Sequence, residues 1–290
     1  GVGVSMDSNL YGEIDPYVAG CYAVSESVRN VVAVGAKPIA LTDCLNYGNP
    51  EKPTVLYDFD QGIKGISDAA NALGFIENEP IPIISGNVSF YNESKSGTAV
   101  TPSPVVMCVG KVENYFHTVT MQVKETHLKL ALLGDRFSEF GGTQFRCEGA
   151  SATVAPQVRL SAEHAQNQMV YSLILKRGVA HVHDIAMGGL WQTVVEMILG
   201  ESGRCHVGVS LDLSAFESLE TALFSENGGY VIAFTNDHQL MVDELVRQFD
   251  VSYYDIGSTC SDLVINLVHP RLEMTVDLED VSQAWKTGQR

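Results

Sequence analysis

The hydrophobic positions of the first 120 residues follow two alternating periods, one typical of helices and one of strands. A helix is predicted from Asp15–Pro16 to Gly35, because Asp is a favourable N-cap, Pro is accepted at the first helical position and Gly commonly follows a helix end. The pattern also predicts strands near 39–45, 80–85 and 104–112 and a helix at 54–73. This alternation predicts a mixed α/β architecture.

A polar stretch at 113–127 separates these elements from a second series. The second series comprises predicted strands near 128–134, 179–184, 228–235, 263–268 and 273–278 and predicted helices near 161–176, 188–200 and 237–249. We therefore expect two α/β domains, at 1–118 and 119–290, each with a mixed sheet. A chain of 290 residues is long enough for two domains with cores of their own.

The acidic composition narrows the possible partners. The net charge is −17, so nucleic acid and anionic membrane surfaces would be repelled. No apolar run approaches the ~18 residues of a membrane span. A nucleotide remains compatible with this charge, because Mg²⁺ held by protein oxygens can bridge to phosphates. The chain starts at Gly1 without a signal-like segment, as expected of the interior of a longer protein or of a processed chain.

Four predicted strands end directly in small or polar residues, at 42–50, 85–94, 132–135 and 183–190. Ligands usually bind at such strand ends in open α/β sheets. Asp43 fits a turn carboxylate and a ligand of Mg²⁺ or a nucleotide hydroxyl equally well. Gly86–Asn87 fits a phosphate-binding backbone as well as a simple turn. Asn87 and Ser89 could point toward one site.

Other potential sites have simpler explanations. The six cysteines lack the spacing of a zinc site, so reduced thiols are expected. His181 and His183 alternate on one predicted strand, and packed imidazoles are favoured there over a metal site. The chain contains no P-loop, no nucleophile elbow and no H-E-x-x-H helix.

Six motifs in fixed order carry a resemblance to a known family. They are "RNVVAVGAKPIALTDCLNYGNPEKP", "PIISGNVSFYNES", "TPSPVVMCVG", "EFGGTQF", "HDIAMGGL" and "FSENGGY". Together they resemble the C-terminal half of the small, bacterial and archaeal type of phosphoribosylformylglycinamidine synthase, which belongs to the AIR-synthetase-like superfamily. The resemblance covers nearly the whole chain.

The resemblance implies a fold, a reaction and partners. The family's full chain carries two AIR-synthetase-like units, and this chain is similar to the second. The family is a cytoplasmic ATP- and Mg²⁺-dependent C–N ligase of purine biosynthesis. It converts formylglycinamide ribonucleotide to the amidine with ammonia from a glutaminase subunit. Expected partners are the N-terminal half of the synthetase, the glutaminase and a small accessory subunit.

The resemblance also assigns site residues. Asp43 and Gly86 match positions that contact ATP, Asn87 matches a Mg²⁺ ligand, and Ser89 matches a substrate contact. The segment 5–17 contains no histidine where the first unit has its catalytic histidines, and Arg29-Asn30 stands in place of an Arg-Asp pair. No catalytic residue is therefore expected, and the chain alone should be inactive.

An auxiliary nucleotide or metal site would use Asp7 and Asp184. Ala186 and Met187 replace the Ser and Asp of the family's auxiliary motif, which argues against that site. The alternatives to the ligase half are a structural half without ligand contacts and a small-molecule kinase of the same superfamily. The first domain's sheet is expected to have an exposed apolar face, through which the isolated chain should form a homodimer.

Overall fold

The computed structural model describes residues 1–76, 79–145, 153–200 and 203–287. The first part of the chain forms β1 (Val2–Asp7), η1 (Tyr11–Glu13), α1 (Pro16–Ala33), β2 (Lys37–Asn46), α2 (Pro53–Ala72), β3 (Ile83–Ser89), β4 (Ser103–Lys111) and η2 (Tyr115–His117). The second part forms β5 (Lys129–Leu133), α3 (Leu160–Leu175), β6 (His181–Asp184), α4 (Gly189–Leu199), β7 (Gly208–Asp212), α5 (Leu219–Phe224), β8 (Tyr230–Phe234), η4 (Asn236–His238), α6 (Gln239–Phe249), β9 (Tyr253–Cys260), β10 (Val264–His269), β11 (Leu272–Asp277) and α7 (Leu278–Thr287).

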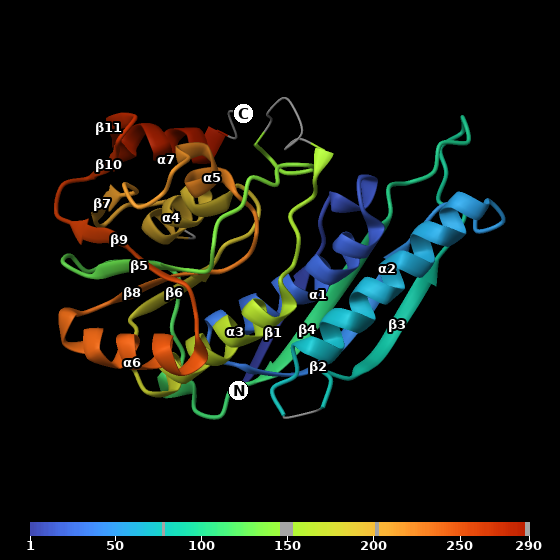
Figure 1. The fold of residues 1–290 in the computed structure, drawn as a ribbon, viewed down its shortest axis with the longest axis horizontal. Coiled ribbons are helices and arrows are strands. Elements are labelled where there is room, and N and C mark those ends of the chain that lie inside the picture. Colours follow the sequence, from blue (N-terminus) through green and yellow to red (C-terminus); the bar gives the residue numbers. More distant parts are fainter. Residues whose placement is uncertain (77–78, 146–152, 201–202, 288–290) are drawn as a thin grey trace.

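These elements build two mixed sheets, which confirms the predicted α/β class (Figure 1). The first sheet has the strand order β1-β4-β2-β3, and the second has the order β11-β10-β7-β9-β5-β8-β6. The predicted boundary at 118/119 falls in the segment that joins the two sheets, and it stays a prediction.

The second sheet is covered on both faces, because successive side chains of β5 pack into different cores. Leu130 and Leu132 pack into the core that contains α4 and α5. Ala131 and Leu133 pack into the core that contains α3 and α6. Figure 1 shows these two helix layers above and below the sheet.

Helix α1 begins as the sequence predicts. The Asp15 carboxylate accepts hydrogen bonds from the backbone N–H groups of Tyr17 and Val18, at 3.0 and 3.1 Å, and Pro16 opens the helix. The helix is buried on nearly all sides, because it lies against the first sheet and α2 as well as against α3 and β6. Helix α1 therefore joins the two domains into one core.

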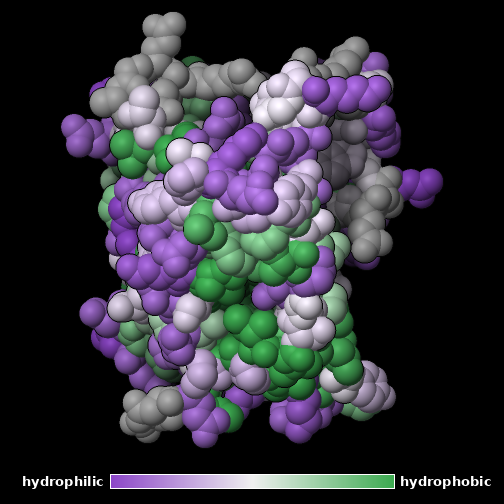
Figure 2. All heavy atoms as spheres, turned by 90° about the vertical axis from the view of Figure 1, so that its right-hand side faces the viewer, coloured by the Kyte–Doolittle hydropathy of each residue, from purple (hydrophilic) through white to green (hydrophobic). Residues whose placement is uncertain are grey.

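The first sheet is covered on one face only. Leu41 and Leu45 of β2 and Val106 of β4 are buried under α1 and α2. The opposite face exposes an apolar patch, on which no described element packs. The patch consists of the exposed residues Val2, Val4 and Met6 of β1 and the half-buried residues Val105, Met107 and Val109 of β4. Figure 2 views the molecule from this side and shows the hydrophobic side chains (green), so the expected apolar face is present.

Strand β3 corrects one prediction. We expected a buried strand at 80–85 followed by a loop from Gly86, but the strand spans Ile83–Ser89 and is exposed along most of its length. It is exposed because it forms the edge of the first sheet, with β2 as its neighbour and one face uncovered. Parallel pairing with β2 holds Ser85–Ser89 extended, and this pairing is not visible in the local sequence. The alternating strand β1 and the elements β7, β9, α5 and α7 were also not predicted.

The remaining global expectations concern membranes and thiols. Among the described residues, no helix is both long and apolar enough to cross a bilayer. Cys21, Cys44, Cys108, Cys205 and Cys260 are free thiols, as expected, and Cys147 lies outside the described residues.

A buried ion pair connects the domains. Arg29 of α1 is completely buried, and its Nη1 lies 2.8 Å from an Oε1 of Glu163 on α3. Its Nε lies 3.5 Å from Oδ2 of Asp184 on β6. Because both acidic side chains are also buried, the guanidinium compensates charges that water cannot reach.

Replacing Arg29 should therefore destabilise the protein strongly. We expect Arg29→Ala to lower the free energy of unfolding by about 3–5 kcal/mol, because it leaves the buried Glu163 without its cation and Asp184 with His183 alone. Lys111→Ala, which removes an exposed pair with Glu113, serves as control and should cost less than about 1 kcal/mol. Urea unfolding followed by circular dichroism measures both. Equal effects of the two substitutions would contradict the assigned role of Arg29.

Candidate functional site

Three of the predicted site residues lie in one row across the first sheet. Asp7 pairs with Val106, Val106 pairs with Asp43, and Asp43 pairs with Gly86. Since Val106 is buried under the helices, the row belongs to the covered face. Adjacent strands lie about 4.8 Å apart, so the backbones at Asp7 and Asp43, two strands apart, are separated by about 10 Å.

Asp43 and Gly86 form a close pair at the open edge of the sheet. The carboxylate of Asp43 lies against the backbone of Gly86, and a Cβ at Gly86 would come within 2.2 Å of Oδ1. Partial burial raises the pKa of Asp43, while a hydrogen bond from the backbone N–H of Asn87 acts in the opposite direction. Only glycine leaves room for this carboxylate. The position of the Asp43 side chain therefore depends on the absence of a side chain at Gly86.

Asn87 and Ser89 lie on the other, uncovered face. Side chains alternate along a strand, and Asn87 pairs with Cys44, which in turn pairs with Val105 of the apolar patch. Ser89 follows on the same face, in register with Asn46. Asn87 and Ser89 thus lie on one face of the sheet, opposite the face that carries Asp43 and Gly86, and their common site stays a prediction.

This arrangement fits Mg²⁺ and a nucleotide only in part. Asn87 is exposed and offers a neutral oxygen, which suits a hard cation. Within the described ranges, however, no group of three or more His, Cys, Asp or Glu side chains is placed to hold a metal ion. A bound Mg²⁺ would need most of its oxygen ligands from phosphates, water or a partner that covers the uncovered face.

Asp184 and Asp7 belong to the interdomain contact. Asp184 is 2% exposed, and its Oδ1 lies 3.2 Å from Nδ1 of His183. Burial would raise the pKa of Asp184, but the interactions with His183 and Arg29 outweigh it and lower the pKa. Asp7 accepts a hydrogen bond from the Ser5 hydroxyl at 2.5 Å, and burial raises its pKa. Both carboxyl groups are engaged inside the protein.

Both histidines of the "HVHD" strand have protein partners, in line with the packed imidazoles favoured above. His181 Nε2 lies 2.8 Å from Glu125, and His183 Nε2 lies 2.8 Å from Glu196. Burial disfavours the charged imidazole of His183, yet its hydrogen bonds to Asp184 and Glu196 raise the pKa to about 9.

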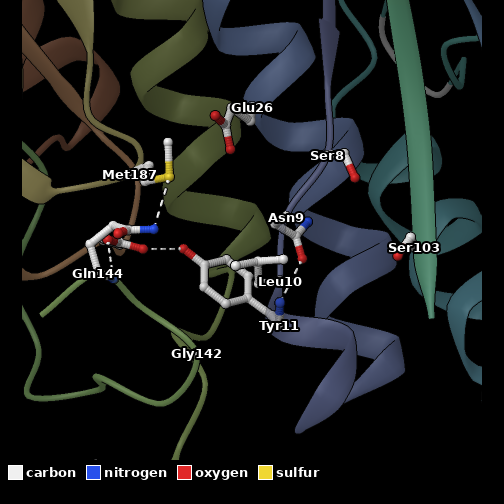
Figure 3. A pocket seen from close by; sticks show the side chains of 10 residues that line it. Ser8, Asn9, Leu10, Tyr11, Glu26, Ser103, Gly142, Gln144 and Met187 are labelled. Atoms are coloured by element: carbon white, nitrogen blue, oxygen red, sulfur yellow. Dashed lines mark hydrogen bonds between the residues drawn. The ribbon is translucent and has the colours of Figure 1, made fainter. Parts of the chain in front are cut away.

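A pocket of about 200 Å³ opens between the domains (Figure 3). Its walls come from the loop after β1, from α1, and from the loops around Gly142, Met187 and Glu226. It is lined by Ser8, Asn9, Leu10, Tyr11, Glu26, Ser103, Gly142, Gln144, Met187 and Glu226. None of these side chains is basic. The sequence analysis did not predict this pocket, although "FSENGGY", with its acidic residue directly before Asn-Gly-Gly, was among the motifs.

Glu26 gives the pocket a group that titrates near neutral pH. Burial raises the pKa of Glu26 to about 8, although the nearby Arg29 acts in the opposite direction. The folded protein therefore holds this proton over a pH range in which the unfolded chain, with an ordinary value near 4.5, has lost it.

Glu26 should make the protein less stable as the pH rises. Between about pH 4.5 and 8 the folded state binds more protons than the unfolded state, so the free energy of unfolding falls with pH. Glu26→Gln should remove this contribution and be more stable than wild type at pH 8–9 by on the order of 1–3 kcal/mol. Urea unfolding between pH 5 and 9 measures the difference, and His183 contributes equally to both proteins. Parallel stability curves would contradict the assignment.

The two-domain fold and its sheet-edge site define a class of protein. The family model described as AIR synthase related protein, N-terminal domain, matches residues 1–112, and the corresponding C-terminal domain model matches residues 127–268. The chain belongs to the AIR synthase related family.

Within that family, the chain is similar to subunits of one synthase. It is 37% identical, over its full length, to the phosphoribosylformylglycinamidine synthase subunit PurL of Methanothrix thermoacetophila, of which it covers 38%. It is 36% identical to the PurL subunit of Methanothermobacter marburgensis, aligned over 89% of the chain and 35% of that protein. The chain thus spans less than two fifths of the length of these curated relatives.

A solved structure, T. maritima PurL complexed with FGAR, shares the fold. It superposes with a TM-score of 0.78 over 97% of this chain and 46% of that chain, at 17% identity.

Proposed function

We propose that this chain is the second half of a phosphoribosylformylglycinamidine synthase and supplies ligand contacts to an active site completed by the first half. The observation that carries this proposal is the position of Asn87 and Ser89. Both lie on the uncovered face of the first sheet, and Asn87 is in register, through Cys44, with Val105 of the apolar patch.

The apolar patch explains how such a site would be completed. A sheet of a partner that packs on Val4, Met6 and Met107 removes their side chains from water, which stabilises the association. The same packing places residues of the partner's sheet opposite Asn87 and Ser89. Binding of the partner and completion of the site are then one event, and the polar edge of the face becomes a ligand site at the junction.

Each of the four residues has a proposed role. Asp43 and Gly86 contact ATP from the open edge of the sheet, where the absence of a side chain at Gly86 leaves room for the Asp43 carboxylate. Asn87 contributes an oxygen to Mg²⁺, and Ser89 contacts formylglycinamide ribonucleotide. ATP, when bound, supplies activation of the amide oxygen that ammonia replaces.

The chain lacks the general base of this reaction in its own first loop. The segment 5–17 would occupy the place of the family's catalytic histidines, and it contains no histidine. We therefore propose that the chain is inactive alone and acts in the cytoplasm with the first half, a glutaminase and a small accessory subunit. An auxiliary nucleotide at Asp7 and Asp184 is not part of the proposal, because both carboxyl groups are already engaged.

Substitutions in the full-length synthase test the contact roles. Asp43→Asn and Asn87→Ala should each lower kcat/KM at least about 100-fold, equivalent to about 2.7 kcal/mol of transition-state stabilisation. Asp60→Asn and Asn71→Ala, which change exposed residues of α2, serve as matched controls and should leave it within about twofold. Steady-state kinetics with ATP and formylglycinamide ribonucleotide provide the measurement. Wild-type activity of both site variants would instead support a purely structural half.

The apolar patch should make the isolated 290-residue chain self-associate. We expect a homodimer at tens of micromolar, roughly the range of a weak dimer, because two uncovered faces can cover each other. Val4→Glu should shift the chain to monomer by placing a charge in that contact. Leu240→Glu, at an exposed apolar residue of α6, is the matched control and should remain dimeric. Sedimentation velocity distinguishes these states, and a monomeric wild type would contradict the expectation.

A further inference from the structure

The carboxylate of Glu226 is the most highly connected group of the interdomain pocket. Glu226 is 2% exposed. Its Oε1 accepts hydrogen bonds from the backbone N–H groups of Gly188, at 2.7 Å, and Gln144, at 2.9 Å. Its Oε2 accepts a hydrogen bond from the Tyr11 hydroxyl at 2.7 Å. Three donors from three separate segments therefore converge on one carboxylate.

The Gly188 N–H is a donor of the kind that binds anions. Gly188 is the N-cap of α4, an eleven-residue helix, and its φ of 84° is readily adopted only by glycine. The N–H groups at a helix start have no partner within the helix and carry a partial positive charge. Phosphates bind proteins at such positions. Here the protein's own carboxylate occupies this position.

The rest of the pocket offers no compensation for a second anion. Among the described residues, its lining contains no basic side chain, and Glu26 is its other carboxyl group. A phosphate entering the pocket would meet the charge of Glu226 at close range, in a setting where solvent screens weakly. The Ser8 hydroxyl and the Gln144 side-chain amide also line the pocket and can hydrogen-bond to uncharged molecules (Figure 3).

We infer that Glu226 sets the charge of what the interdomain pocket can hold. Its carboxylate acts as a built-in anion on the N–H groups of Gly188 and Gln144. The pocket consequently rejects nucleotide phosphates and other anions and admits uncharged or cationic polar molecules. This inference concerns the pocket between the domains, does not involve the sheet-edge residues Asp43 and Asn87, and stands independently of the proposed function.

Titration of the 290-residue chain with inorganic phosphate tests the inference. Chains labelled with ¹⁵N at glycine and glutamine report on the amides of Gly188 and Gln144. In wild type, phosphate should leave both resonances unchanged up to ~10 mM. In Glu226→Ala the vacated N–H groups should bind phosphate with a Kd of roughly 1–10 mM, seen as saturable shifts of both amides. Glu13→Ala, which removes an exposed carboxylate near Tyr11, is the charge-matched control and should behave as wild type.

Each outcome of the titration either supports or overturns the inference. Saturable shifts in the wild type, or their absence in a folded Glu226→Ala chain, overturn the inference. Should that variant fail to fold, Glu226→Gln, which keeps the shape of the side chain, carries the test. Loss of one charge should then let phosphate shift both amides below ~10 mM, which it does not do in wild type, and unshifted resonances overturn the inference. The Gly86 amide reports the sheet-edge site separately within the same spectra.

Discussion

The first sheet is covered by helices on one face only, and the interpretation of the whole molecule depends on this constraint. A sheet normally buries its apolar face against another layer. Here α1 and α2 cover one face, while Val2, Val4 and Met6 leave the other face apolar and exposed. The second sheet, by contrast, is covered on both faces. The unbalanced layer thus identifies the face on which a further layer is expected, and the candidate ligand residues Asn87 and Ser89 lie on that face.

The interdomain contact has the opposite character, because its buried charges have partners within the chain. Arg29 lies between Glu163 and Asp184, and Glu226 receives hydrogen bonds from Tyr11, Gln144 and Gly188. The buried charges are paired within the chain, so this contact fixes how the domains meet. The N–H groups of Gly188 and Gln144 are therefore occupied by the carboxylate of Glu226. The uncovered face with Asn87 and Ser89, in contrast, is open. Both features agree with the proposed half, which would support a site without containing all of it.

Local signals in the sequence predicted the elements that local interactions determine. The start of α1 was correct because Asp15 and Pro16 act within their own turn. Strand β3 was misplaced because its extent depends on pairing with β2, more than 40 residues earlier in the chain. The contacts of Glu226 involve residues 38 to 215 positions away, so no local pattern could reveal them. The residues of the sheet-edge site were named from the family resemblance, but their distribution over two faces follows only from the strand register.

The position of the metal tests the central claim most directly. Crystals of the full-length synthase with Mn²⁺ in place of Mg²⁺ and a non-hydrolysable ATP analogue would locate the ion by anomalous scattering. A half-site completed by the partner predicts a metal peak about 2.0–2.3 Å from the side-chain oxygen of Asn87. It also predicts that a sheet of the partner packs on Val4 and Met6. A metal bound elsewhere, with Asn87 facing solvent and the apolar patch uncovered, would contradict it.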